Sequence, residues 1–132
     1  MSSDSDQSAS KASEAVTYLG PRVGIIQFSG KLRGRRARQL GNQLEDLAQE
    51  GVQRLILDLR DLASIDSLGS YSLEQGIDAG LRLHLVVGPA FDADRCLNLR
   101  GLARRTVKIH RDIEVAIETV RGIVDSGMQL AV

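Results

Sequence analysis

Apolar residues recur at helical spacing in four parts of the chain. Between residues 35 and 50 they occupy positions 37, 40, 44, 47 and 48, which form one face of an α-helix, and Gly51 is suited to end it. The clearest repeat runs from Ile113 to Val124. Residues 67–79 and 91–100 contain further apolar positions, and a glycine follows each stretch. The pattern predicts four helices.

Five other segments have the composition of β-strands. Residues 55–59 and 83–87 are apolar runs too continuous for a sheet with one face in water, so they are predicted to be buried central strands. Residues 16–19 and 23–28 are β-prone runs separated by Gly-Pro, which predicts a hairpin. Residues 107–109 alternate with charge, which is typical of an edge strand.

The order of these segments defines the fold class. Strands that alternate with helices imply right-handed crossovers and a mostly parallel sheet. We therefore predict an α/β protein in which a mostly parallel mixed sheet of about five strands is covered by about four helices. Ser29-Gly30 is expected to end a strand, and residues 63–66 are expected to form a loop before the second helix.

The 132 residues are expected to form one domain with tails. Residues 1–14 contain six serines and no large apolar residue beyond Met1, which predicts a disordered N-terminal tail. The folded domain is predicted to span residues 15–126, and residues 127–132 are predicted to form a C-terminal tail. No apolar stretch is long enough to cross a membrane and no signal peptide is recognisable, so we expect a cytoplasmic protein without membrane insertion.

The residues that usually carry metal or redox chemistry are few. Cys96 is the only cysteine, so the chain cannot form an internal disulfide or a cysteine-rich metal site. His84 and His110 lack neighbours at ligand spacing, and His84 is best interpreted as a core or rim histidine with one hydrogen bond. Phosphate-loop and dinucleotide motifs are absent from the sequence. We expect neither a metal nor a cofactor.

The formal charge is zero, but the charges are segregated along the chain. Residues 31–38 carry +5, residues 45–78 carry −6 and residues 82–111 carry +5. The basic run 31–38 could contact phosphates, but the neutral total and the small number of aromatic residues argue against a nucleic-acid partner. Such blocks are usually solvated faces, and they also constrain the surface of any protein partner.

One short segment combines several features of a modification site. Asp66, Ser67, Leu68 and Gly69 follow a predicted strand and begin a predicted helix, at the end of the sheet where α/β folds bind their partners. Asp66 is a suitable N-cap, and Ser67 would occupy the first helical position with its hydroxyl exposed. Ser67 is therefore a candidate phosphoacceptor. Because residues 45–78 are acidic, we expect its phosphorylation to deepen an acidic patch.

Several segments together resemble the STAS domain family, which is typified by bacterial anti-sigma factor antagonists. The resemblance spans residues 16–124, and the order of strands and helices agrees with it. The second hydroxyl residue of the family's Asp-Ser-Ser/Thr-Gly motif is replaced by Leu68, and Arg33 and Gly34 replace residues that are usually acidic or polar. Four segments carry the resemblance: Ser29-Gly30-Lys31-Leu32, Leu55-Ile56-Leu57-Asp58-Leu59, Ile65-Asp66-Ser67-Leu68-Gly69 and residues 97–102.

The resemblance implies a STAS-like fold and a regulatory role. In the family, the serine after the aspartate is phosphorylated by a serine kinase that doubles as an anti-sigma factor, and a metal-dependent serine phosphatase restores it. Carried over, the phosphoacceptor is Ser67. The phosphosite motif and partner-binding surface then comprise Asp66, Leu68, Gly69 and Lys31. The unphosphorylated protein is expected to bind the kinase and release the sigma factor.

Two alternatives remain beside this switch. The same fold could serve as a constitutive scaffold, or as a subunit of a stress-signalling or transporter complex, without a phosphorylation switch; homo-oligomers through an exposed strand edge are compatible with this role. An enzyme is not expected, because no motif places a base near Ser67 and the Gly-x-Ser-x-Gly elbow is absent.

Overall fold

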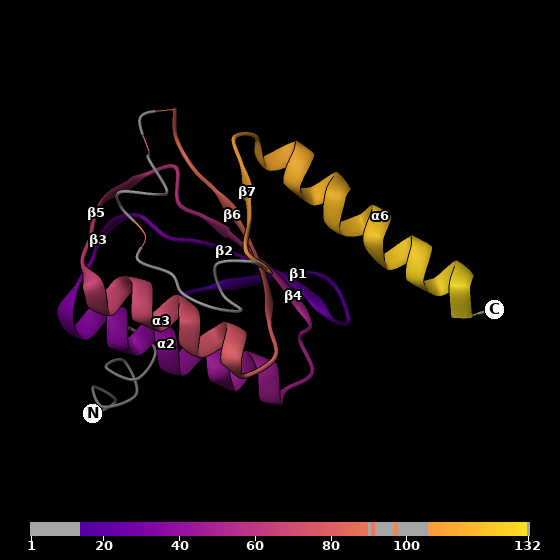
Figure 1. The fold of residues 1–132 in the computed structure, drawn as a ribbon, viewed down its shortest axis with the longest axis horizontal. Coiled ribbons are helices and arrows are strands. Elements are labelled where there is room, and N and C mark those ends of the chain that lie inside the picture. The colour runs from indigo at the N-terminus through magenta and orange to yellow at the C-terminus, as the bar shows by residue number, and fades with distance from the viewer. Residues whose placement is uncertain (1–13, 90, 92–96, 98–105, 132) are drawn as a thin grey trace, which may run out of the picture.

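The central feature of the fold is a five-stranded sheet with helices on both faces (Figure 1). The computed structural model describes residues 14–89, 91, 97 and 106–131, with side chains up to residue 122. The strand order is β1-β2-β4-β6-β7. The strands span Val16–Gly20 (β1), Val23–Gln27 (β2), Arg54–Asp58 (β4), Arg82–Val86 (β6) and Lys108–His110 (β7).

The pairing of the strands confirms the predicted mixed sheet. β1 and β2 form the antiparallel hairpin, and every other neighbouring pair in the sheet is parallel. β7 lies at the edge, as its alternating sequence predicts. The two continuous apolar runs form β4 and β6, which lie inside the sheet, as predicted. Their sequences are apolar throughout because each strand contributes side chains to hydrophobic clusters on both faces of the sheet.

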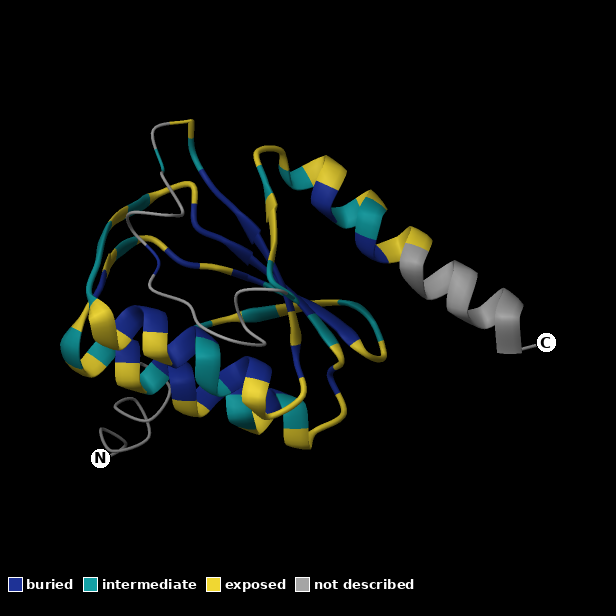
Figure 2. Cartoon of the chain, in the orientation of Figure 1, coloured by how far each residue is buried: buried dark blue, intermediate teal, exposed yellow. Residues whose placement is uncertain are grey.

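The two faces of the sheet are covered differently (Figures 1 and 2). Helices α2 (Gly34–Gln49) and α3 (Ser67–Asp78) cover one face, where they bury the larger hydrophobic cluster. The first half of helix α6 (Ile113–Ala131) packs on the other face, where its residues up to Val120 join a smaller cluster. Within β4, Leu55 and Leu57 belong to the first cluster and Ile56 to the second, as the alternation of a strand requires.

A second, two-stranded sheet corrects the predicted loops. β3 (Gly30–Leu32) and β5 (Leu62–Ile65) pair in parallel at the ends of the segments where we expected a chain break and a loop. Gly30 adopts a φ of 84°, so it does interrupt the preceding strand, and a new strand starts there. Because β3 leads into α2 and β5 leads into α3, this small sheet holds the first turns of the two helices together.

Helices α2 and α3 pack closely through small residues. A Cβ atom at Gly41 would lie 3.2 Å from Ser72 Cβ, and one at Gly76 would lie 2.9 Å from Leu44 Cδ1. Both helices follow parallel strands, so they run side by side with their N-termini at the same end. The glycines therefore allow an approach that larger side chains would prevent.

Three of the four predicted helices lie in the described part of the chain. Cys96, most of the expected tail 1–14 and the expected helix 91–100, apart from Phe91 and Leu97, lie outside the described residues. Glu14, the last residue of that tail, is described: its N–H donates to Gln43 Oε1 at 3.0 Å, and Gln43 Nε2 donates to its carbonyl at 2.6 Å. α6 runs to Ala131 and so includes most of the expected C-terminal tail 127–132.

Candidate functional site

Asp66 is the N-cap of helix α3, as the sequence predicts. Its backbone is extended, and its Oδ1 accepts a hydrogen bond from the Gly69 N–H at 2.9 Å. This bond satisfies one of the backbone donors that a helix start leaves free. Ser67 is consequently the first residue of the helix, and it is exposed.

The same aspartate also ties α3 to the segment before α2. Its Oδ2 accepts from the Gly34 N–H at 3.2 Å, and its own N–H donates to the Leu32 carbonyl at 3.3 Å. The bonds from Gly69 and Gly34 and the nearby Arg33 guanidinium hold the pKa of Asp66 below its ordinary value. The carboxylate therefore stays ionised and fixes the position from which Ser67 projects.

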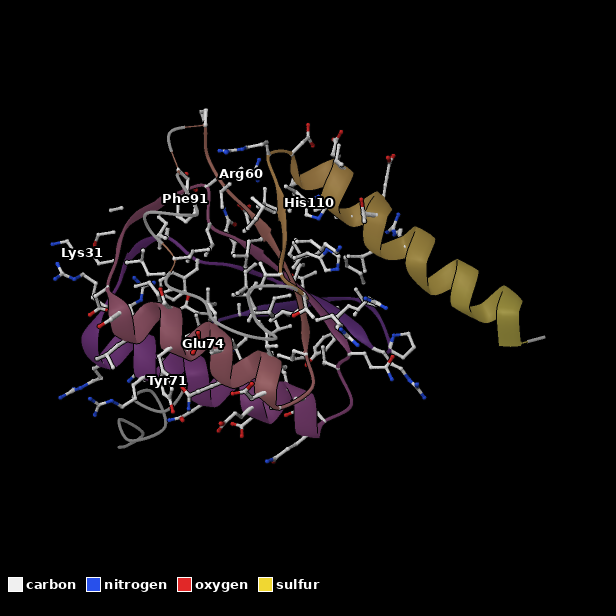
Figure 3. All side chains as sticks on the ribbon, in the orientation of Figure 1. Lys31, Arg60, Tyr71, Glu74, Phe91 and His110 are labelled. Atoms are coloured by element: carbon white, nitrogen blue, oxygen red, sulfur yellow. The ribbon has the colours of Figure 1, made fainter. Side chains whose placement is uncertain are left out.

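The first turns of α3 present both polar and apolar side chains to solvent. Ser67 and Leu68 are exposed, and one turn later Tyr71 has an exposed fraction of 58%. Gly69 is buried instead, so it acts in packing and not as a contact surface. Tyr71 is labelled with Lys31 in Figure 3. The sequence interpretation missed Tyr71, although an exposed aromatic one turn after Ser67 is a usable signal in a chain with so few aromatic residues.

The charge around Ser67 differs from the expected acidic patch. Pairing of β3 with β5 places Lys31 opposite Ser64 and Leu32 opposite Ile65, so the basic run 31–38 begins beside the Asp66–Ser67 segment. Arg33 is close enough to lower the pKa of Asp66. The segment that carries the candidate phosphoacceptor therefore lies beside cations that are remote from it in sequence, so a phosphate there would meet the basic run as well as the acidic residues of 45–78.

One cation of the basic run has a structural role. Arg36 lies with its guanidinium carbon 4.0 Å from the centre of the Phe28 ring, and its Nη1 donates to the Ser29 carbonyl at 2.7 Å. It also forms an ion pair with Glu14 at 3.5 Å. Lys31, which we expected at the partner surface, is exposed, as are Arg33, Arg35 and Arg38.

Substitutions at Asp66 should separate its two roles. Asp66→Ala removes both acceptors, so the backbone N–H groups of Gly69 and Gly34 should exchange faster with solvent and the melting temperature should fall. Asp66→Asn keeps one side-chain oxygen for the cap but turns an N–H₂ group toward Gly34, so only the Gly34 amide should exchange faster. Amide exchange followed by NMR measures both effects. Equal protection of Gly34 in Asp66→Asn and the parent would contradict the second role.

The two histidines lie far from this site in the fold, on the face of the sheet that α6 covers. His84 is buried, and its Nδ1 is 3.2 Å from Nε2 of His110 in the neighbouring strand. This confirms a core histidine with one hydrogen bond and identifies its partner. No group of three or more candidate metal-ligating residues is present in the described part of the chain.

Comparisons with known proteins agree with this architecture. The STAS domain family profile matches residues 14–116. A Thermotoga maritima protein assigned as an anti-sigma factor antagonist is 27% identical with a TM-score of 0.62, over 82% of this chain and 94% of that chain. A Mycobacterium paratuberculosis anti-sigma factor antagonist is 21% identical with a TM-score of 0.62, over 83% and 96%.

The Bacillus protein SpoIIAA shares the fold at lower identity. Its unphosphorylated form is 18% identical with a TM-score of 0.57, over 83% of this chain and 99% of that chain. It has also been solved in a phosphorylated form, at 15% identity and a TM-score of 0.53 over 82% and 99%. No curated protein sequence matches the chain. No helix among the described residues is long and apolar enough to span a membrane.

Proposed function

The chain belongs to the STAS domain family, and on this premise we propose that it is an anti-sigma factor antagonist controlled by phosphorylation of Ser67. The unphosphorylated protein binds an anti-sigma factor that is also a serine kinase, and this binding releases the sigma factor. Phosphorylation of Ser67 ends the interaction, and a serine phosphatase restores it. The protein acts by binding and performs no catalysis of its own.

The observation that carries this proposal is the presentation of Ser67. The hydroxyl is exposed at the first position of α3, and the ionised Asp66 cap holds that position by bonds to two different segments. A kinase can reach such a hydroxyl without unfolding the domain. A phosphate there adds about −1.5 to −2 charges at the positive end of the helix, where the fold tolerates negative charge.

Two further observations support a switch over a passive scaffold. The exposed Leu68 and Tyr71 lie within one turn of Ser67, so a phosphate would stand at the edge of the surface that a partner would cover. In addition, the fold is shared with SpoIIAA, a protein whose structure is known in both unphosphorylated and phosphorylated forms.

Phosphorylation of a variant series tests this function. We expect incubation with the cognate anti-sigma kinase and ATP to add one phosphate to the parent protein and none to Ser67→Ala, as read by intact mass. Ser29→Ala removes another exposed serine and is the matched control, so it should be phosphorylated like the parent. Phosphate on Ser67→Ala would remove Ser67 from the acceptor role.

Binding to the same kinase tests the switch itself. The unphosphorylated protein should bind in calorimetry, and the phosphorylated protein should bind at least about tenfold more weakly, which is about 1.4 kcal/mol. Equal binding of the two forms would contradict the switch and support the constitutive scaffold instead.

A further inference from the structure

Helix α2 carries charges at both ends that oppose its own dipole. A helix is stabilised by acidic groups in its first turn and basic groups in its last turn. In α2 the first turn contains no acidic residue and the last turn no basic one. Arg35 and Arg36 occupy the start instead, while Asp46 and the C-cap Glu50 occupy the end. This arrangement costs the helix stability.

Apart from Arg36, the cations in the first turns of α2 have no acidic partner within the helix. Arg35 has Arg38 and Gln39 at the positions where an acidic partner would lie, and Arg38 has Gly41 and Asn42. The N-cap Arg33 makes no side-chain capping bond. In the described part of the chain the two ion pairs are Arg36–Glu14 and Arg60–Asp58, so the exposed cations Lys31, Arg33, Arg35 and Arg38 form none. Arg33 helps to lower the pKa of Asp66, but Lys31, Arg35 and Arg38 have no such effect on a described group. Local rules broken without a structural gain are typical of functional surfaces.

The exposed cations adjoin the exposed apolar residues of α3. The two helices meet where Gly41 faces Ser72. Arg38 lies one turn before Gly41 in α2, and Leu68 lies one turn before Ser72 in α3. Because the two helices run in the same direction, Arg38 and Leu68 both lie on the N-terminal side of the Gly41–Ser72 contact. Tyr71 extends the apolar area along the exposed face of α3, below Lys31 in the view of Figure 3.

We propose that Lys31, Arg33, Arg35 and Arg38, together with Leu68 and Tyr71, form one docking surface for an acidic protein partner. The surface fits a partner that presents carboxylates around an apolar hollow. This inference rests on the proposed function, and it names the chemistry that the anti-sigma partner must offer. A protein fits better than a nucleic acid, because the apolar part consists of one aliphatic and one aromatic side chain and the chain as a whole is neutral.

The proposal gives phosphorylation of Ser67 a specific effect. A phosphate on Ser67 would place negative charge near Arg33, the cation that lowers the pKa of the neighbouring Asp66. It would neutralise cations that the partner's carboxylates use, and it would repel those carboxylates directly. Phosphorylation then weakens docking by charge competition within the surface.

An acidic peptide is the probe for this surface. We would titrate ¹⁵N-labelled protein with a short peptide of alternating glutamate and leucine, and in parallel with its lysine-leucine counterpart and a single-stranded oligonucleotide. The acidic peptide should give saturable shifts of amides in residues 31–38 and 68–71. Binding by the oligonucleotide alone, shifts elsewhere in the fold, or no saturable binding would overturn the proposal.

Charge reversal supplies the matched comparison. Arg35→Glu/Arg38→Glu should weaken the acidic peptide by about tenfold or more, because two rim charges change sign. Arg82→Glu/Arg121→Glu makes the same charge change at exposed cations on β6 and α6, and it should leave affinity within about twofold. Equal loss in both double variants would overturn the localisation.

A thermal melt excludes a purely structural role for these arginines. The Arg35→Glu/Arg38→Glu variant should melt at the parental temperature or above it, because the new charge at position 35 agrees with the helix dipole and position 38 is exposed. A lower melting temperature would contradict the argument from α2. The two proposals can fail separately. If Arg35→Glu/Arg38→Glu binds the acidic peptide like the parent while the kinase phosphorylates Ser67 of the parent, the docking surface is wrong and the proposed function stands. If the parent binds the acidic peptide through residues 31–38 and 68–71 but the kinase adds no phosphate at Ser67, the proposed function is wrong and the docking surface stands.

Discussion

Replacing Gly69 with alanine is expected to destabilise the protein by about 1–3 kcal/mol. On helix propensity alone the change should stabilise α3 by up to about 1 kcal/mol, because Gly69 is a helical residue. The new Cβ, however, would lie 2.5 Å from Ile65 Cγ1 and 2.7 Å from the Leu32 carbonyl oxygen. That carbonyl accepts the Asp66 N–H, so it cannot move without breaking the attachment of α3 to β3. The steric cost therefore exceeds the propensity gain.

Gly122→Ala is the control for this prediction. Gly122 also lies in a helix, α6, and a Cβ at that position would meet nothing within 4 Å. It should gain the propensity term alone and become more stable by up to about 1 kcal/mol. Denaturant unfolding of both variants measures the difference. If Gly69→Ala is as stable as Gly122→Ala, the close packing of the α3 start against β3 is wrong.

The main sheet and three helices could be predicted because their signals are local. A helix face repeats within a few residues, and a buried strand is a continuous apolar run, so α2, α3, α6, β4 and β6 were all visible in the sequence. The strands β3 and β5 were missed because each is three or four residues long and has no pattern of its own. Their pairing is a contact between distant segments, which no local pattern reports.

The candidate site shows the same division. The Asp66 cap and the exposed Ser67 follow from a capping residue before a helix, so the sequence was sufficient. Its electrostatic surroundings were not predictable, because the pairing of β3 with β5 brings the basic run 31–38 beside a segment that is acidic in sequence. Blocks of charge along the sequence predict a surface patch only where sequence neighbours are also neighbours in space. Pairing of parallel strands brings distant segments together, so the blocks do not predict the charge around Ser67.

The histidine pair on the other face of the sheet was also beyond a local pattern. His84 lies between Ile56 of β4 and Lys108 of β7 in the strand register, and His110 follows two residues later along β7, beside Val86. The two imidazoles share a hydrogen bond in which one ring must donate and the other accept. Burial lowers the pKa of His84 to about 4, with further contributions from His110, Arg54 and Lys108.

Acid is therefore expected to destabilise the protein before its carboxylates titrate. The unfolded chain binds a proton at His84 with a pKa near 6.5, while the folded protein binds it only near pH 4. The contribution of His84 to the free energy of unfolding is therefore fully present above pH 6.5, and it is lost as the pH falls toward 4. The loss across this window amounts to about 3 kcal/mol. Burial and Lys108 also lower the pKa of His110, which adds to the loss in the same direction. Unfolding in denaturant at a series of pH values measures the slope.

Two variants attribute this slope to His84. His84→Gln keeps an amide that can bond to His110 but cannot titrate, so most of the loss between pH 6.5 and 4 should disappear. Lys108→Gln removes a cation that faces His84, so it should raise the pKa of His84 and make the slope shallower without abolishing it. Because the chain has two histidines, their NMR titrations are readily assigned. A His84 titration midpoint near 6.5 in the folded protein would contradict the burial of His84 beside Arg54 and Lys108. It would also contradict the pairing of β7 with β6 and the packing of α6 on this face of the sheet.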